Sequence, residues 1–282
     1  MHKTVVYSWQ EVTQRLSIDN RWEEAQKYLS STERTHGISL QQLWKLTDQA
    51  WDELYDANTN NRCLESFLSN FYQHPVWLIN AAFCESDPST INDRLAAIRL
   101  IRHVAPCKVL DFGGGFGTVS RLCAETIPDV NTIDLVDISE TRHVVQQFLS
   151  EYPKIRVLEK PAPLYDAVVS TEVLEHVIDP IETVIEINNL LRKGGAFSAS
   201  WSFVPVVKCH LPHNYHLQTI MLWIIRSLGF GFYGFERRGS TVYGFVKHSD
   251  ITPGMVKKAR LLEKIAKFPL PIDRVLFLLQ GL

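Results

Sequence analysis

The first hundred residues carry a pattern of apolar and polar positions that is typical of helices. In the stretch SLQQLWKLTDQAWDELYD, Leu40, Leu43, Leu46 and Leu54 recur near intervals of three and four residues, so they share one face of a helix. Neighbouring stretches such as RWEEAQKYL and STINDRLAAIRLIRHV have similar spacing, and none gives a strong strand signal. The pattern predicts an N-terminal helical cap over residues 1–105.

After Pro106 the pattern changes to short apolar runs that alternate with helical stretches. This alternation is typical of parallel strands joined by right-handed helical crossovers. Five strands are expected from the segments CKVLDF, NTIDLVD, IRVLE, YDAVVS and AFSASWSF. Two more, FYGFERR and STVYGFVKH, flank Gly239, which favours a hairpin. The predicted fold class is α/β, with a mostly parallel seven-stranded sheet within residues 106–250.

The helix boundaries of this part are marked by caps and breakers. After the fourth predicted strand, Asp179 is suited to the N-cap, Pro180 to the first turn and Gly194 to the position just past the helix end. A further helix is expected over residues 217–228, where Gly229 would end it.

Residues 251–282 are predicted to form a C-terminal helical extension in which basic and apolar residues are mixed, as in VKKARLLEKIAKF. Such a segment can lie on a membrane surface, face a partner subunit or pack back on its own domain. The last arrangement is the commonest for an amphipathic helix, and we expect it here.

Composition narrows the class of protein. The chain has 282 residues, and 45% of them are hydrophobic, which is enough for a full core. Its net charge of -2 argues against nucleic acid as the partner, because neutralising phosphates needs an excess of Lys and Arg. The five cysteines have no repeated spacing, which predicts free thiols in a reducing compartment. Since no apolar run approaches ~18 residues, we expect a soluble cytoplasmic protein without a membrane span.

A glycine-rich turn follows the first predicted strand, in VLDFGGGFGTVS. Glycines at a strand-to-helix turn let backbone amides approach a ligand at the helix N-terminus, as NAD, FAD and other nucleoside cofactors require. The dinucleotide pattern G-x-G-x-x-G, started at Gly113, would need glycine or alanine where Thr118 stands. Twenty residues beyond Gly117, Asp137 ends the second strand, where a carboxylate can accept hydrogen bonds from ribose hydroxyls.

The turn resembles motif I, D-x-G-x-G-x-G, of the class I S-adenosylmethionine-dependent methyltransferases. The later stretch YDAVVSTEVLEHVIDP is similar to the fourth-strand motif of the small-molecule, ubiquinone-biosynthesis type of this family, and LLRKGGAF resembles its turn into the fifth strand. The resemblance implies a Rossmann-like, doubly wound sheet and S-adenosyl-L-methionine as cofactor. It also implies an SN2 methyl transfer to a small or medium-sized organic acceptor.

The resemblance further implies roles for individual residues. Asp137 would hold the ribose hydroxyls, Ile138 would pack on adenine, and Thr171 would lie near the sulfonium. The residues implied to cradle the methionine and ribose end are Asp111, Gly113, Gly114, Gly115 and Gly117.

Two features depart from the family pattern. An acidic residue after the third strand commonly contacts adenine in the family, and here Glu159 is the candidate, in a short link to the fourth strand. The helical segment before residue 106 is not explained by the family motifs. It is expected to fold over the site as a lid. Tyr72 and His74 are candidate pocket residues, and packing between helices is the alternative favoured for each of them alone.

The acceptor side is expected in the segment KCHLPHNYHL, residues 208–217, which follows the fifth strand and therefore emerges at the ligand-binding edge of a parallel sheet. Such a cluster can hold a metal, move a proton or only make structural hydrogen bonds. No metal is expected, because the family chemistry does not ordinarily require one. The residues expected to act as base or to orient the acceptor are His213, His216 and His176.

Two other functions are compatible with parts of the sequence. An NAD-linked oxidoreductase would share the glycine turn and Asp137, although Thr118 disfavours it. A non-catalytic S-adenosylmethionine-binding partner subunit would keep the cofactor fold and lose the acceptor pocket. The acceptor atom and the oligomeric state are not fixed by the sequence.

Overall fold

The computed structural model describes residues 6–57, 63–137, 142–237 and 239–268. As the apolar spacing predicts, the described residues before the first strand of the sheet contain helices and connecting loops but no strand. Two short 3-10 helices, Gln26–Tyr28 and Arg102–Val104, accompany seven α-helices. These are α1 (Trp9–Leu16), α2 (Trp22–Ala25), α3 (Ser31–His36), α4 (Leu40–Ala57), α5 (Leu64–Phe71), α6 (Val76–Ser86) and α7 (Pro88–Ile101).

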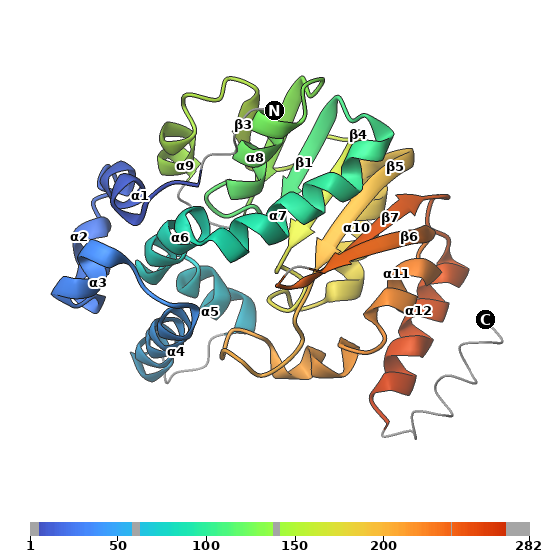
Figure 1. The fold of residues 1–282 in the computed structure, drawn as a ribbon. Helices are drawn as coiled ribbons and strands as arrows, with labels where there is room; N and C mark the ends of the chain where they lie inside the picture. Colours follow the sequence, from blue (N-terminus) through green and yellow to red (C-terminus); the bar gives the residue numbers. More distant parts are fainter. Residues whose placement is uncertain (1–5, 58–62, 138–141, 238, 269–282) are drawn as a thin grey trace.

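A seven-stranded sheet with the order β3-β2-β1-β4-β5-β7-β6 forms the centre of the molecule (Figure 1). Its first five strands are parallel and β7 is antiparallel to both β5 and β6, which confirms the predicted α/β class and the predicted hairpin. The strands are β1 (Lys108–Phe112), β2 (Thr132–Val136), β3 (Ile155–Leu158), β4 (Tyr165–Thr171), β5 (Leu191–Ser200), β6 (Phe230–Arg237) and β7 (Thr241–Lys247).

The strand order reverses direction beside β1, which has β2 on one side and β4 on the other. Ligands of open parallel sheets bind beyond the carboxyl ends of the strands at such a point. The crossover helices α8 (Thr118–Thr126), α9 (Arg142–Phe148) and α10 (Pro180–Leu190) complete the doubly wound part.

Two predicted helix boundaries were wrong. Helix α10 has Asp179 as its N-cap as expected, but it ends at Leu190, and β5 begins at Leu191 because that residue pairs with Tyr165 of β4. The helix expected over residues 217–228 is preceded by a 3-10 helix, Pro212–Leu217, and α11 starts only at Met221. The amide of Ile220 donates to the carbonyl of Leu217, and this three-residue spacing interrupts the α-helical pattern.

The last helix of the N-terminal segment, α7, belongs to the layers around the sheet. Its buried Ile91, Ile98 and Ile101 join one apolar cluster with Val109 of β1 and Val242 of β7. Helices α1 to α6 lie to the left of α7 in the view of Figure 1. Of these, α4 to α6 stand on the side toward which the parallel strands point. The N-terminal segment is therefore attached to the sheet through a shared core.

Helix α12 (Pro253–Ala266) packs on α11, with Ala259 and Leu262 buried. Arg260 forms an ion pair with Asp179, the N-cap of α10, at 2.5 Å. The described part of the C-terminal extension thus packs back on its own domain, as expected. Among the described helices, none is long and apolar enough to cross a membrane.

A buried ion pair joins the N-terminal helices to the first crossover helix. Glu85 of α6 and Arg121 of α8 are both fully buried and lie 2.7 Å apart, and Arg121 also bonds Glu125. Two such charges are expensive to remove from water, so each depends on the other for compensation.

We predict that Glu85→Gln lowers the free energy of unfolding by about 3 kcal/mol, because removing one partner leaves a buried guanidinium undercompensated. Urea denaturation followed by circular dichroism measures the loss. Glu151→Gln is the matched control, since Glu151 pairs with Arg15 at the surface and should cost less than about 1 kcal/mol. Equal losses in the two variants would contradict the assigned role of the buried pair.

Candidate active site

The turn between β1 and α8 has a backbone that requires glycine. Gly113, Gly115 and Gly117 have positive φ angles of 71°, 54° and 83°. A Cβ at Gly113 would lie 2.6 Å from the Val173 side chain, and one at Gly117 would lie 2.6 Å from Leu149. At Gly115, in contrast, none of the described residues lies within 4 Å of an added Cβ. Of these three glycines, Gly113 and Gly117 are packed closely against the protein, and Gly115 is left uncovered by the described residues.

Asp111 lies on the buried side of this turn. Its carboxylate is buried and accepts hydrogen bonds from the amide and hydroxyl of Ser120 at 2.9 and 2.7 Å. A Cβ at Gly114 would lie 2.5 Å from the Asp111 carboxyl carbon, so the turn crosses directly over this side chain. Burial raises the pKa of Asp111 to about 6, and the Ser120 hydrogen bonds partly oppose that rise.

Asp137 stands beside the open glycine at the carboxyl end of β2. It is half-buried, and its Oδ2 accepts a hydrogen bond from the Gly115 amide at 2.8 Å. A carboxylate next to an open, amide-lined turn is suited to hold the hydroxyls of a ribose. Ile138, the expected adenine contact, lies outside the described residues. The other expected contact, Glu159, is exposed and lies 3.9 Å from Arg142.

The loop after β4 adjoins the glycine turn. Thr171, the last residue of β4, pairs with Ser200 of β5. Glu172 follows with φ 54°, uncommon for a residue with a side chain, and its amide donates to the carbonyl and hydroxyl oxygens of Ser200. The next residue is Val173, whose side chain packs on Gly113. Thr171 and Glu172 are therefore close to the edge of the turn.

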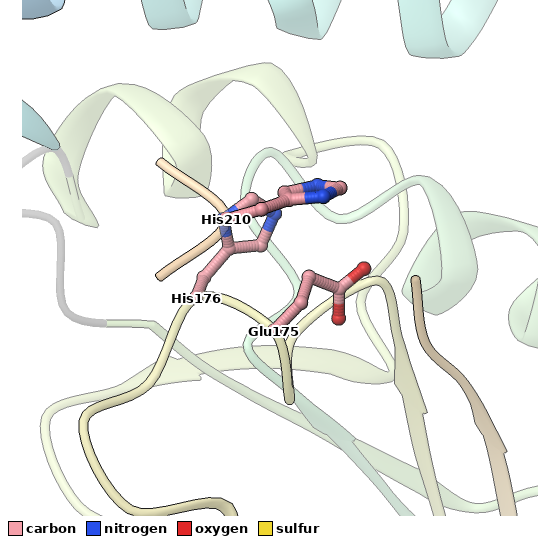
Figure 2. A group of neighbouring side chains, drawn as sticks. All are labelled: Glu175, His176 and His210. Atoms are coloured by element: carbon pink, nitrogen blue, oxygen red, sulfur yellow. The ribbon is translucent and has the colours of Figure 1, made fainter. Parts of the chain in front are cut away.

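The same loop contributes to a cluster of three side chains, Glu175, His176 and His210 (Figure 2). Each offers one nitrogen or oxygen atom, and these atoms lie within 4.8 Å of one another. His210 comes from the segment after β5, which is joined to the first loop by the Leu211 amide donating to the Glu175 carbonyl. The His176 and His210 rings meet edge to face with centroids 4.9 Å apart.

Burial sets the charge of this cluster. It lowers the pKa of His176 to about 3, and the charge of His210 adds to the effect. Burial also lowers the pKa of His210, and it raises the pKa of Glu175 well above its usual range, where the charge of Glu172 acts in the same direction. Both imidazoles are thus neutral near pH 7, each with one ring nitrogen able to accept a hydrogen bond or bind a cation.

The structure gives the two histidines preferred from the sequence other neighbours. His213 is exposed, and its Nε2 lies 2.9 Å from the carbonyl oxygen of Ile178. The Nε2 of His216 lies 3.7 Å from Glu263 of α12. Of the expected set, only His176 belongs to the cluster, and sequence reasoning missed His210 and Glu175 as its partners. Their sequence signal was present, since Glu175 lies in the fourth-strand motif and His210 in the histidine-rich segment.

The N-terminal helices cover this cluster through Tyr72. The ring of Tyr72 lies edge-on to that of His176, with centroids 6.4 Å apart, and its hydroxyl is buried with no hydrogen-bond partner among the described residues. Burial raises the pKa of this hydroxyl well above its usual value. The Nε2 of His74, the other candidate pocket residue, lies 3.2 Å from the Tyr28 hydroxyl within the helical segment, which agrees with the packing alternative.

We predict that stability falls as pH rises between about 4 and 6 through Asp111. The unfolded chain loses this proton near pH 3.8, whereas the folded protein keeps it until about pH 6, so unfolding releases a proton between these values. The loss is about 3 kcal/mol. Asp111→Asn should remove that part of the pH dependence in urea denaturation, while the exposed Asp129→Asn should retain it. A pH profile unchanged by Asp111→Asn would refute the assignment.

Comparison with known sequences agrees with this geometry. Residues 83–207 match the family described as a methyltransferase domain. The malonyl-[acyl-carrier protein] O-methyltransferase of Halalkalibacterium halodurans is 31% identical over 131 residues, which are 43% of this chain and 48% of that protein. This chain therefore spans about half the length of that relative. The ubiquinone biosynthesis O-methyltransferase of Nitrosospira multiformis is 32% identical over 179 residues, 60% of this chain and 70% of that protein.

Solved structures share the fold. Human N-acetylserotonin methyltransferase, solved in complex with S-adenosylmethionine, superposes with a TM-score of 0.53 at 18% identity, over 80% of this chain and 70% of that one. An O-methyltransferase family protein from Burkholderia thailandensis gives 0.52 at 13% identity, over 78% and 77%. Together with the relative from Nitrosospira multiformis, the glycine turn and the strand order, these findings confirm the resemblance seen in the motifs: the chain belongs to the class I S-adenosylmethionine-dependent methyltransferases.

Proposed function

We propose that this methyltransferase acts on a hydroxyl oxygen of a small or medium-sized organic acceptor. The observation that carries the proposal is that one loop connects the glycine turn to the cluster of Glu175, His176 and His210. Val173 of this loop packs on Gly113, and the loop continues into Glu175 and His176. A glycine turn with a carboxylate thus adjoins a largely buried cluster that can orient a hydroxyl or bind a cation. The relatives named as O-methyltransferases support oxygen as the acceptor atom.

The residues of the glycine turn fit the cofactor. None of the described residues covers Gly115, and Asp137 beside it is suited to the ribose hydroxyls. Gly113, Gly114 and Gly117 would shape the turn, with Asp111 below it, and Thr171 would face the sulfonium from the end of β4. When bound, S-adenosylmethionine supplies an electrophilic methyl group on a positively charged sulfur.

The chain's own contribution is alignment, exclusion of water and handling of one proton. A hydroxyl must lose its proton before or during attack on a methyl group, and a group that accepts it or lowers its pKa speeds the reaction. His176, His210 and Glu175 are placed to orient that hydroxyl, because each neutral imidazole has a ring nitrogen that can accept its hydrogen bond. Helices α4 to α6 cover the region, because the loop residues Val207, Cys209 and Leu211 share an apolar cluster with Phe67 and Phe71. Such a cover favours a dry site in which charges act strongly.

We predict that Asp137→Asn weakens S-adenosylmethionine binding by about 10- to 100-fold, the loss expected when hydrogen bonds to a charged acceptor become neutral ones. Isothermal titration calorimetry with S-adenosylmethionine, S-adenosylhomocysteine and NAD measures this directly. The exposed Asp129→Asn should bind like the wild type. Saturable binding of NAD alone would refute the proposed cofactor site.

We predict that His176→Ala lowers methyl transfer by about 100-fold, because loss of a group that orients the acceptor hydroxyl misplaces it for attack. A screen of hydroxylated acceptors with S-adenosylmethionine labelled in its methyl group supplies the assay. The variants His213→Ala and His216→Ala test the pair preferred from the sequence, and the exposed His36→Ala is the control. A larger loss in His213→Ala or His216→Ala than in His176→Ala would place the acceptor side elsewhere.

A further inference from the structure

We propose that Glu175, His176 and His210 together bind one divalent transition-metal ion, which holds the acceptor's oxygen for methylation. The metal site stands on the geometry of these three side chains alone. Only its chemical role rests on the proposed methyl transfer to oxygen.

The two imidazoles are oriented as metal ligands are. The Nδ1 of His176 lies 3.1 Å from the carbonyl oxygen of Cys209, and the Nδ1 of His210 lies 2.8 Å from that of Val204. A carbonyl can only accept, so each Nδ1 carries the proton and each Nε2 keeps its lone pair. Histidines that bind metals almost always donate their other ring N–H to such a partner, which fixes the ring and raises the basicity of the ligating nitrogen.

Glu175 supplies the carboxylate. Its side chain is fully buried, and Oε1 accepts a hydrogen bond from the Ser202 amide at 3.0 Å. The second oxygen, Oε2, is buried and has no hydrogen-bond partner among the described residues. A buried carboxylate oxygen without a partner is costly, and the neighbouring charge of Glu172 adds to the cost. A cation coordinated by Glu175 would offset both.

The spacing of the three groups suits a single ion after a small contraction. Ligand atoms about 2.1 Å from one ion lie roughly 3 to 4 Å from each other. The present atoms lie within 4.8 Å, so shifts of a few tenths of an ångström in each side chain would bring them to that range. Figure 2 shows the two rings and the carboxylate gathered at one place, from loops that are joined by hydrogen bonds.

The donor set indicates the class of ion. Two imidazoles and one carboxylate favour Zn²⁺, Fe²⁺, Co²⁺ or Mn²⁺, whereas Mg²⁺ prefers oxygen ligands throughout. Three protein ligands leave coordination positions open to a substrate. We therefore expect an acceptor with a second oxygen next to the reacting hydroxyl, such as a vicinal diol, a catechol or a hydroxy acid.

The ion would act as a Lewis acid toward the acceptor. Coordination lowers the pKa of a hydroxyl, so near neutral pH its proton is lost to the solvent as the acceptor binds, before the site is closed to water. A bond then forms between that oxygen and the methyl carbon while the carbon–sulfur bond breaks. The products are a methyl ether and S-adenosylhomocysteine, and the ion is not consumed or oxidised.

The test begins with tag-free, full-length protein stripped of metal with a chelator. Titration with Co²⁺ should show one equivalent bound, with visible absorption bands, and Zn²⁺ should displace it while Mg²⁺ should not. His210→Ala and Glu175→Gln should each weaken Co²⁺ binding by about 100-fold. His36→Ala is the matched control, because His36 is exposed and also has its Nδ1 near a backbone carbonyl, that of Thr32.

Three outcomes would overturn the metal site: no stoichiometric Co²⁺ binding by the wild type, Co²⁺ binding as tight as that of the wild type in both ligand variants, or a loss of Co²⁺ affinity as large in His36→Ala as in the ligand variants. Circular dichroism checks that the variants fold. If one of the ligand variants does not fold, measurements on the wild type test the site. One bound ion must raise the melting temperature of the wild type and perturb the proton resonances of two histidines.

Calorimetry with S-adenosylmethionine on the metal-free protein separates this inference from the proposed function. Cofactor binding without Co²⁺ binding would refute the metal site and leave methyl transfer standing. Co²⁺ binding without cofactor binding would refute the proposed methyl transfer and leave the metal site standing.

Discussion

The hydrogen bonds between the loops after β4 and β5 are the contacts on which the candidate site depends. The Leu211 amide donates to the Glu175 carbonyl, and His176 donates from Nδ1 to the Cys209 carbonyl. These two bonds bring His210 beside His176 although the residues are 34 positions apart in the sequence. They also present Cys209 and Leu211 to the N-terminal helices, which pack on them. The contacts between these two loops therefore form the cluster and also hold the N-terminal helices over it.

The N-terminal helices that cover the cluster are held at both ends, so they can enclose an acceptor while keeping their position. At one end α7 shares the core of the sheet, and the buried pair of Glu85 and Arg121 fixes α6 to α8. At the other end Tyr72 reaches the edge of His176. Because the cofactor turn precedes α8, a contact that holds α8 to α6 also sets the distance between the cover and the turn. Packing of the helical segment is thus part of how the site is shaped.

The sequence predicted what local rules determine and missed what only the tertiary structure determines. The glycine turn, the seven strands and the N-cap Asp179 follow from spacing and residue type, and all are present. The end of α10 was wrong because the pairing of Leu191 with Tyr165 overrides helix propensity. His213 and His216 were attractive by proximity in the sequence, but a 3-10 turn at Pro212 directs them to Ile178 and Glu263. No periodicity predicts that His210 meets Glu175, since their contact depends on two loops folding together.

Several unfavourable features gather at the carboxyl ends of β1 and β4. Asp111 and Glu175 are buried carboxyls with raised pKa values, and Glu172 has a left-handed backbone. Glu175 also has an oxygen that finds no hydrogen-bond partner in the described part of the chain. Each of these costs stability, and the large apolar core around the sheet offsets them. Strain and unpaired polar groups of this kind persist where ligands are held, because a ligand can supply the missing partner. Their location at one edge, between an open glycine and two oriented imidazoles, is best explained by a site whose last contacts are made by the cofactor, the ion and the acceptor.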